Sequence, residues 1–175
     1  MLHNKTPNYL LTGTLHNTTN AITKNNPQPL QALNLPTYSP ILSPQGDKIY
    51  DPIRKRNIVL TPEEWVRQHI INYLVAHLGY PAGRMAVEKE LNYNQLKRRF
   101  DILVYDAHLK PYLIVECKAP NIPITQVTFN QIAMYNKVVN AHILVVSNGI
   151  KHYCSTFNQQ KNCYEFINQI PAYTI

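Results

Sequence analysis

Two carboxylates and a lysine stand at a spacing that could hold a metal ion. Asp101 lies in one apolar stretch, and Glu116 and Lys118 close the next one after a polar turn. If the two stretches pair as a symmetric hairpin, Tyr105 faces Tyr112, and the same register sets Asp101 opposite Glu116. Directly opposed residues have Cβ atoms about 4.5–5.5 Å apart. Two facing carboxylates repel each other unless a cation lies between them, so the pattern predicts a metal site.

The alternative is that these charges lie on a solvated strand face. Side chains alternate along a strand, which puts Lys118 on the same face as Glu116. The neighbouring side chains are apolar and mostly large: Ile102, Val104, Leu113 and Val115. Such runs are typical of central strands covered on both faces, where charges are rarely buried without a partner or a metal. This burial rule favours the functional interpretation.

The composition favours a polyanionic partner. The 175 residues fit one domain. Lys and Arg number 17 against 10 Asp and Glu, which gives a net charge of +7, and nucleic acid is the usual partner for such a balance. Of the clusters at 54–56 and 97–99, the second directly precedes Asp101, so Lys97, Arg98 and Arg99 are candidate nucleic-acid-binding residues. Any single one of them could equally be a solvated charge.

The cysteines and the hydropathy pattern restrict the class of protein further. Cys117, Cys154 and Cys163 show no CxxC spacing, so they predict neither a zinc site nor a disulfide framework. A reducing cytoplasm is expected, with Cys117 a small core residue on the strand face opposite Glu116. We expect no membrane span, because no apolar run approaches about 18 residues, and no signal peptide.

Two segments precede the elements that must position the carboxylates. Residues 1–30 are rich in Asn, Thr and Gln and predict a flexible N-terminal arm, so that residues 31–175 form the folded domain. Residues 31–60 contain four prolines among Leu, Ile and Tyr. They predict an extended wrap that ends in a short strand near residues 58–60.

The rest of the chain predicts an α/β fold with a mixed central sheet. Thr61, Pro62 and Glu64 are an N-cap, a first helical residue and a capping-box acid, and Gly79 ends this helix. The other expected elements are a strand at 85–91, the carboxylate hairpin, a helix at 125–139, a strand at 141–147 and closing strands at 151–157 and 164–167, the last of which could equally be a helical turn.

An Asp on one strand and Glu-x-Lys on the next, between two helices, resembles the PD-(D/E)xK nuclease superfamily. Here the elements are Asp101 and Glu116-Cys117-Lys118. The similarity is closest to the N-terminal nuclease domain of type I restriction enzyme R subunits, and more narrowly to its short stand-alone relatives, over residues 51–68, 98–106, 116–126, 131–136 and 145–154. It covers roughly residues 30 to 175 and implies a restriction-endonuclease-like αβββαβ core. Phe100, in place of proline, precedes Asp101.

The resemblance also implies the chemistry. It implies hydrolysis of DNA phosphodiester bonds with Mg²⁺, for which Mn²⁺ could substitute. Asp101 and Glu116 would hold the ion, and the backbone carbonyl of Cys117 could add a ligand. Lys118 would orient the attacking water or neutralise the developing negative charge.

Both helices carry further candidates. Related nucleases place an acid on the first helix, and Glu63 is preferred to Glu64 because it is in phase with the apolar positions, whereas Glu64 can complete the capping box. First-turn acids that complement the helix dipole explain either residue equally well. Gln131 and Tyr135 match a QxxxY motif whose members would contact the site or the DNA backbone, although a surface Gln and a core Tyr explain the same letters.

The leading functional prediction is a Mg²⁺-dependent DNA endonuclease in the cytoplasm. Its expected partners are DNA and other restriction or defence-system subunits, with a homodimer left open. No Walker-type GxxxxGK[ST] sequence is present, so we do not expect the chain to translocate DNA by itself. The alternative is a DNA-binding accessory protein that keeps the fold but has little or no activity alone. A structural protein with a coincidental motif would leave the charges at 98–118 unexplained.

Overall fold

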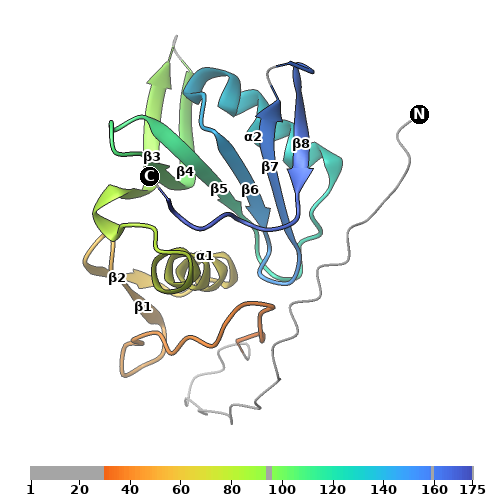
Figure 1. Cartoon of the computed structure of the whole chain (residues 1–175). Helices are drawn as coiled ribbons and strands as arrows, with labels where there is room; N and C mark the ends of the chain where they lie inside the picture. The colour runs from red at the N-terminus through yellow and green to blue at the C-terminus, as the bar shows by residue number, and fades with distance from the viewer. Residues whose placement is uncertain (1–29, 94–95, 159, 175) are drawn as a thin grey trace.

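A six-stranded mixed sheet forms the centre of the computed structural model (Figure 1). The structure describes residues 30–93, 96–158 and 160–174, and for 91–93 and 96–98 it describes the backbone only; the predicted arm at 1–29 therefore lies outside the described residues. The strand order follows the chain: β3 (Met85–Tyr93), β4 (Leu96–Tyr105), β5 (Pro111–Cys117), β6 (Ile143–Ser147), β7 (His152–Asn158) and β8 (Cys163–Ile167). β5 and β6 are parallel, and the other neighbours are antiparallel. The predicted α/β class and mixed sheet are confirmed, and β8 is a strand.

The two helices cover opposite faces of this sheet (Figure 1). Helix α1 (Pro62–Asn72) packs Val66 and Ile70 against one face, and α2 (Gln126–Val139) packs Phe129 and Ile132 against the other. The central strands β4, β5 and β6 therefore contribute buried side chains to both clusters, as their continuous apolar runs predicted. Within the described residues, no helix is long and apolar enough to cross a membrane.

Helix α1 begins where its sequence predicted. The Thr61 side chain accepts a hydrogen bond from the backbone N–H of Glu64 at 3.0 Å, and Pro62 is the first helical residue. The regular helix is shorter than expected, because a π-helical turn (Tyr73–His77) follows it. The chain then leaves the helix at Gly79, whose φ of +74° is one that glycine adopts without strain.

The β4–β5 hairpin has the predicted register next to the site. Ile102 pairs with Val115 and Val104 with Leu113. The register shifts after Val104, so Tyr105 pairs with Pro111 and the predicted Tyr105–Tyr112 pair is wrong. The shift arises in the turn, where the carboxylate of Asp106 accepts from the backbone N–H groups of residues 108 and 110, each at 2.8 Å, and tightens the loop.

The segment before α1 runs beside that helix and ends in the predicted short strand (Figure 1). Asn34 donates its backbone N–H to the Gly149 carbonyl at 2.7 Å, and the indole of Trp65 donates to Gln31 O at 3.0 Å. The strand predicted near 58–60 is β2 (Arg56–Val59), and it pairs with an additional strand, β1 (Lys48–Asp51), in a separate two-stranded hairpin. This hairpin supplies buried charges to the site.

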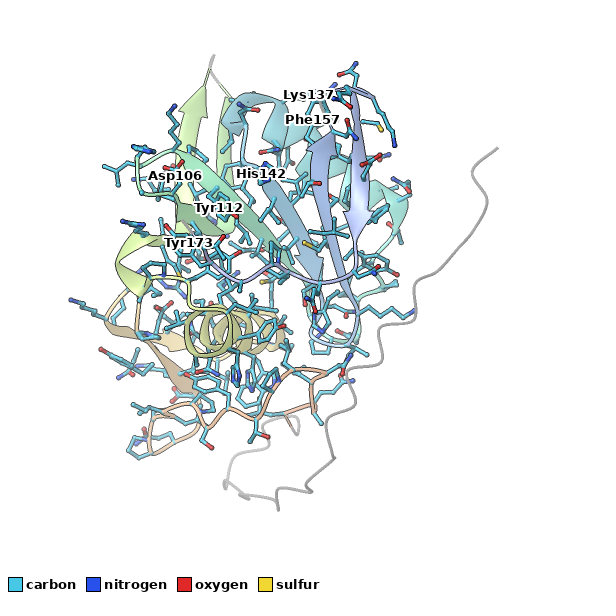
Figure 2. All side chains as sticks on the ribbon, in the orientation of Figure 1. Asp106, Tyr112, Lys137, His142, Phe157 and Tyr173 are labelled. Carbon is cyan, nitrogen blue, oxygen red and sulfur yellow. The ribbon has the colours of Figure 1, made fainter. Side chains whose placement is uncertain are left out.

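The C-terminal segment packs near the start of β5. The backbone N–H of Tyr173 donates to Leu78 O at 2.8 Å, and the Tyr80 hydroxyl donates to Pro171 O at 2.9 Å. The Tyr173 ring lies edge-on against Tyr112 at the start of β5, with centroids 6.0 Å apart (Figure 2). The carboxylates lie at the other end of β5.

Candidate active site

Asp101 on β4 and Glu116 on β5 stand at adjacent positions of neighbouring strands. The register that pairs Ile102 with Val115, continued by one residue, sets Asp101 opposite Glu116. Asp101 is buried, and its Oδ2 accepts the backbone N–H of Cys117 at 2.6 Å. Its Oδ1 accepts from Arg67 Nη2 on α1 at 2.7 Å. The strands therefore bring together the two carboxylates that the sequence pattern singled out.

The side-chain alternation of β4 is interrupted at Asp101. Phe100 packs in the α2-side cluster and Ile102 in the α1-side cluster, although residues two apart on a regular strand share a face. Glu88, which lies opposite Asp101 on β3 between two regular pairs, has a φ of +51°. Such irregularities re-aim a side chain, and here the Asp101 carboxylate meets Arg67 on α1.

Glu116 and Lys118 form an ion pair at the end of β5. Lys118 Nζ lies 2.7 Å from Glu116 Oε1, and the Lys118 backbone N–H donates to Ser147 O on β6 at 2.9 Å. Burial raises the pKa of the Glu116 carboxyl, and the nearby charge of Asp101 raises it further, against the opposing effect of Lys118. The Glu116 carboxyl is therefore easier to protonate than a free one, although it pairs with Lys118.

Cys117, between these two residues, is fully buried in the α1-side core. Burial, followed by the charge of Asp101, raises the pKa of its thiol well above the usual value. A neutral buried thiol is a poor nucleophile, so Cys117 is a core residue as predicted. Its backbone N–H already holds Asp101.

The two acids at the start of α1 have different surroundings. Glu63 is 43% exposed, and its Oε1 accepts from Arg67 Nη2 at 3.1 Å, the nitrogen that also binds Asp101. Burial and then Asp101 raise the pKa of Glu63, against Arg67. Glu64 is buried and accepts from Arg54 at 2.5 Å and Gln68 at 2.8 Å, and it pairs with Arg67. Glu63 therefore lies beside the predicted ligands, and Glu64 lies behind them.

Two arginines with little-exposed side chains were not indicated by the sequence pattern. Arg67 joins α1 to Asp101, and Arg54, in the turn of the β1–β2 hairpin, lies 2.5 Å from each of three carboxylates: Asp51, Glu64 and Glu88. Arg54 is the first of three consecutive basic residues, a pattern typical of a solvent-exposed patch. The sequence therefore did not indicate that Arg54 pairs with carboxylates inside the fold. The i,i+4 spacing of Glu63 and Arg67 was the available signal for Arg67.

The QxxxY pair lies on α2, and its tyrosine contacts the residue of β4 that precedes Asp101. Gln131 Nε2 donates to the Tyr135 hydroxyl at 2.7 Å. The Tyr135 ring contacts Phe100 edge-on, with centroids 6.3 Å apart, and Phe100 directly precedes Asp101. The structure therefore relates this motif to the site through Phe100.

The basic residues of β4 flank the same point. Arg99 is 60% exposed, and its Nη2 lies 3.6 Å from Glu88 Oε1. Lys97 and Arg98 have their backbones in β4, and their side chains lie outside the described residues. Arg99 is thus an exposed cation beside the cluster of carboxylates.

The donor set fits a hard divalent cation. Among the described side chains, no group of three or more His, Cys, Asp or Glu residues is arranged as a ready metal cage. In the described part of the chain, the ion pairs of this region join Arg54, Arg67, Arg99 and Lys118 to a larger set of carboxylates: Asp51, Glu63, Glu64, Glu88, Asp101 and Glu116. Carboxylate oxygens are the ligands that Mg²⁺ prefers.

The chain is similar to one protein family and to one solved structure. A family model described as the type I restriction enzyme R protein N terminus matches residues 62–171. Among solved structures, a fragment assigned as the HsdR subunit of a type I restriction enzyme from Vibrio vulnificus YJ016 is similar, with 16% identity and a TM-score of 0.46. The match covers 65% of this chain and 24% of that one. No curated protein matches the chain. The residues matched by the family model include Glu63, Asp101, Glu116 and Lys118 and begin after the β1–β2 hairpin.

Proposed function

Because the chain belongs to the family of type I restriction enzyme R protein N-termini, we propose that it is a nuclease module that hydrolyses DNA phosphodiester bonds with a divalent cation. The observation that carries the proposal is the meeting of Asp101 with Glu116 and Lys118 at adjoining positions of β4 and β5. A protein that only binds DNA has no need of two opposed carboxylates, one buried and one partly buried, whose repulsion costs stability.

Asp101, Glu116 and the carbonyl of Cys117 would hold Mg²⁺, or Mn²⁺ in its place. The bound ion would acidify a water molecule and withdraw charge from the phosphoryl oxygens. The backbone N–H of Cys117 holds Asp101 Oδ2 at 2.6 Å, which limits the rotation of that carboxylate. Neighbouring strands thus keep the ligands in place before DNA arrives.

Lys118 would act as a charged donor. Although burial opposes it, the bond to Glu116 raises the pKa of the Lys118 amine, so Nζ carries its proton at neutral pH. A protonated amine can orient a water molecule or stabilise the negative charge that develops on a phosphoryl oxygen. It cannot take a proton from the attacking water.

Glu63 and the residues around the site would complete the contact with DNA. The partly exposed Glu63 carboxylate can accept a hydrogen bond from the attacking water. Arg99, with Lys97 and Arg98, would pair with backbone phosphates, and Gln131 and Tyr135 would contact the site or the same backbone. The net charge of +7 favours this partner over a cationic one.

The wider setting is also a proposal. Membership of a restriction-enzyme family supports other restriction or defence-system subunits as partners, and a homodimer is a further arrangement to test. The three free cysteines suit the reducing cytoplasm.

The proposal is tested with supercoiled plasmid and Mg²⁺ or Mn²⁺. Wild type should nick or linearise the DNA, and Asp101→Asn and Lys118→Met should reduce the rate by about 10²-fold or more, the scale of losing a residue that stabilises developing charge. Glu165→Gln, which removes an exposed carboxylate on β8, is the matched control and should cut like wild type. A wild type that binds DNA but never cuts with either metal would instead establish the accessory role.

A further inference from the structure

The Arg67 guanidinium is held between three carboxylates, one of which is the predicted ligand Asp101. Nη2 donates to Asp101 Oδ1 at 2.7 Å and to Glu63 Oε1 at 3.1 Å, and Nη1 pairs with Glu64. The side chain is 4% exposed. One buried cation therefore occupies oxygen atoms of two carboxylates that face the site.

Arg67 also has acceptors behind the site. Glu64 is bonded through Nη1, and Glu88 Oε1 lies 4.0 Å from the same nitrogen. Within the described residues, Arg67 Nε is buried and has no hydrogen-bond partner, which is costly for a charged group. The present arrangement is thus incompletely satisfied, and Glu64 and Glu88 would retain the guanidinium if its bond to Asp101 were broken.

A divalent ion on Asp101 would meet this guanidinium at close range. Both oxygens of Asp101 already accept protein hydrogen bonds, one from Arg67 and the other from the Cys117 N–H. Like charges a few ångströms apart repel strongly where water is excluded. The backbone N–H is fixed by the strand, whereas the arginine side chain can move.

We propose that Arg67 competes with the divalent cation for Asp101, so that the cation binds as Arg67 releases Asp101 and stays on Glu64. The inference rests on the proposed function only in its choice of a divalent cation as ligand. It makes Arg67 a positioning residue that sets the cation concentration at which the site fills.

The first test measures Mn²⁺ binding by titration calorimetry, without DNA. Arg67→Gln should lower the Mn²⁺ dissociation constant by about tenfold or more, equivalent to about 1.4 kcal/mol. Arg99→Gln is the matched control, because it removes an equal charge from the exposed edge of the same cluster, and it should change the constant by less than about threefold because exposed charges are screened. An unchanged or weaker affinity in Arg67→Gln, or equal effects of both variants, overturns the proposal.

Two further measurements keep the test decisive if Arg67→Gln does not fold. Arg67→Lys keeps the charge but lacks the planar fork that binds several carboxylates, so it should bind Mn²⁺ more tightly than wild type. In wild-type crystals with Mn²⁺ located on Asp101 by anomalous scattering, Arg67 Nη2 should lie beyond about 3.5 Å from Asp101 Oδ1, outside hydrogen-bond range.

The outcomes separate this inference from the proposed activity. A bond between Arg67 and Asp101 that persists beside a bound Mn²⁺ overturns the competition, as does a wild type that binds no Mn²⁺ in any assay. A wild type that binds Mn²⁺ and releases Arg67, yet cuts no DNA, leaves the inference standing and overturns the nuclease proposal.

Discussion

Replacing Arg54 with methionine should remove much of the stability that joins the β1–β2 hairpin to the site. The Arg54 side chain is 9% exposed and lies 2.5 Å from Asp51, Glu64 and Glu88. Methionine keeps most of the buried volume and removes the charge. Breaking a buried ion pair by removing one partner costs about 3–5 kcal/mol, because the other charge remains buried.

The expected loss of stability is near the lower end of that range, because the carboxylates that pair with Arg54 would keep other partners or some exposure to water. Asp51 keeps hydrogen bonds from Gln68 at 2.9 Å and from two backbone N–H groups at 2.7 and 2.8 Å. Glu64 keeps Arg67 and Gln68, and Glu88 is partly exposed. We therefore expect a loss of about 3 kcal/mol, or about 6–12 °C in Tm at about 2–4 °C per kcal/mol for a chain of this size.

Urea denaturation followed by Trp65 fluorescence measures this loss, with Arg56→Met as the control. Arg56 is the exposed arginine of the same hairpin, and its replacement should change the free energy of unfolding by less than about 0.5 kcal/mol. The slope of the transition should stay constant, since the surface exposed on unfolding is the same. A loss below about 1 kcal/mol in Arg54→Met is the scale of an exposed ion pair. It would refute the conclusion that the three carboxylates around Arg54 depend on its charge.

The pH dependence gives a second signature of the same contact. Despite the opposing effect of burial, hydrogen bonds from the Arg54 backbone and guanidinium lower the pKa of Asp51. A carboxyl group whose pKa is lowered by folding stabilises the fold at pH values above its unfolded pKa of about 3.9. This stabilisation is lost as the pH falls through the folded pKa. The difference between wild type and Arg54→Met should therefore be largest near neutral pH and narrow below about pH 4.

Three further outcomes are expected. Glu116→Gln should raise Tm at pH 7, because burial and then Asp101 raise the pKa of Glu116 and so make its charge destabilising above the unfolded pKa. Thermal scans should show the gain shrinking toward about pH 4. Arg99→Gln should lower the slope of log affinity for DNA against log salt by about 1, measured by fluorescence anisotropy, and an unchanged slope would remove Arg99 from the interface. Asn136→Ala should cost about 1–3 kcal/mol in urea, since its buried amide bonds both Ala141 N and Ala141 O at 2.7 and 2.8 Å.

The part of the site that depends on local pairing could be predicted from the sequence. The polar turn between two continuous apolar runs was enough to predict a register that brings Asp101 opposite Glu116. The Tyr105 pairing failed because the Asp106 turn is tighter than a symmetric loop. The error lies at the far end of the hairpin and leaves the site register unchanged.

The part that depends on distant segments could not be predicted. The change of facing at Asp101, between Phe100 and Ile102, leaves no trace in a period-two pattern. Arg54 is buried because three carboxylates from different elements converge on it, and its neighbours in sequence suggest a solvated patch. Whether Glu63 or Glu64 lies beside Asp101 likewise depends on which face of α1 meets Arg54.

The ion pairs connect these distant segments to the predicted ligand. From the β1–β2 hairpin to β4 the charges alternate in sign: Asp51, Arg54, Glu64, Arg67 and Asp101. Each charge in this series is neutralised in part by the opposite charges beside it. Without the hairpin, Glu64 would lose its ion pair with Arg54, and its attraction for Arg67 would become stronger. If Arg67 competes with the cation, a stronger hold by Glu64 eases its release from Asp101. The hairpin lies before the residues matched by the family model, yet through Arg54 it should tune cation binding at Asp101.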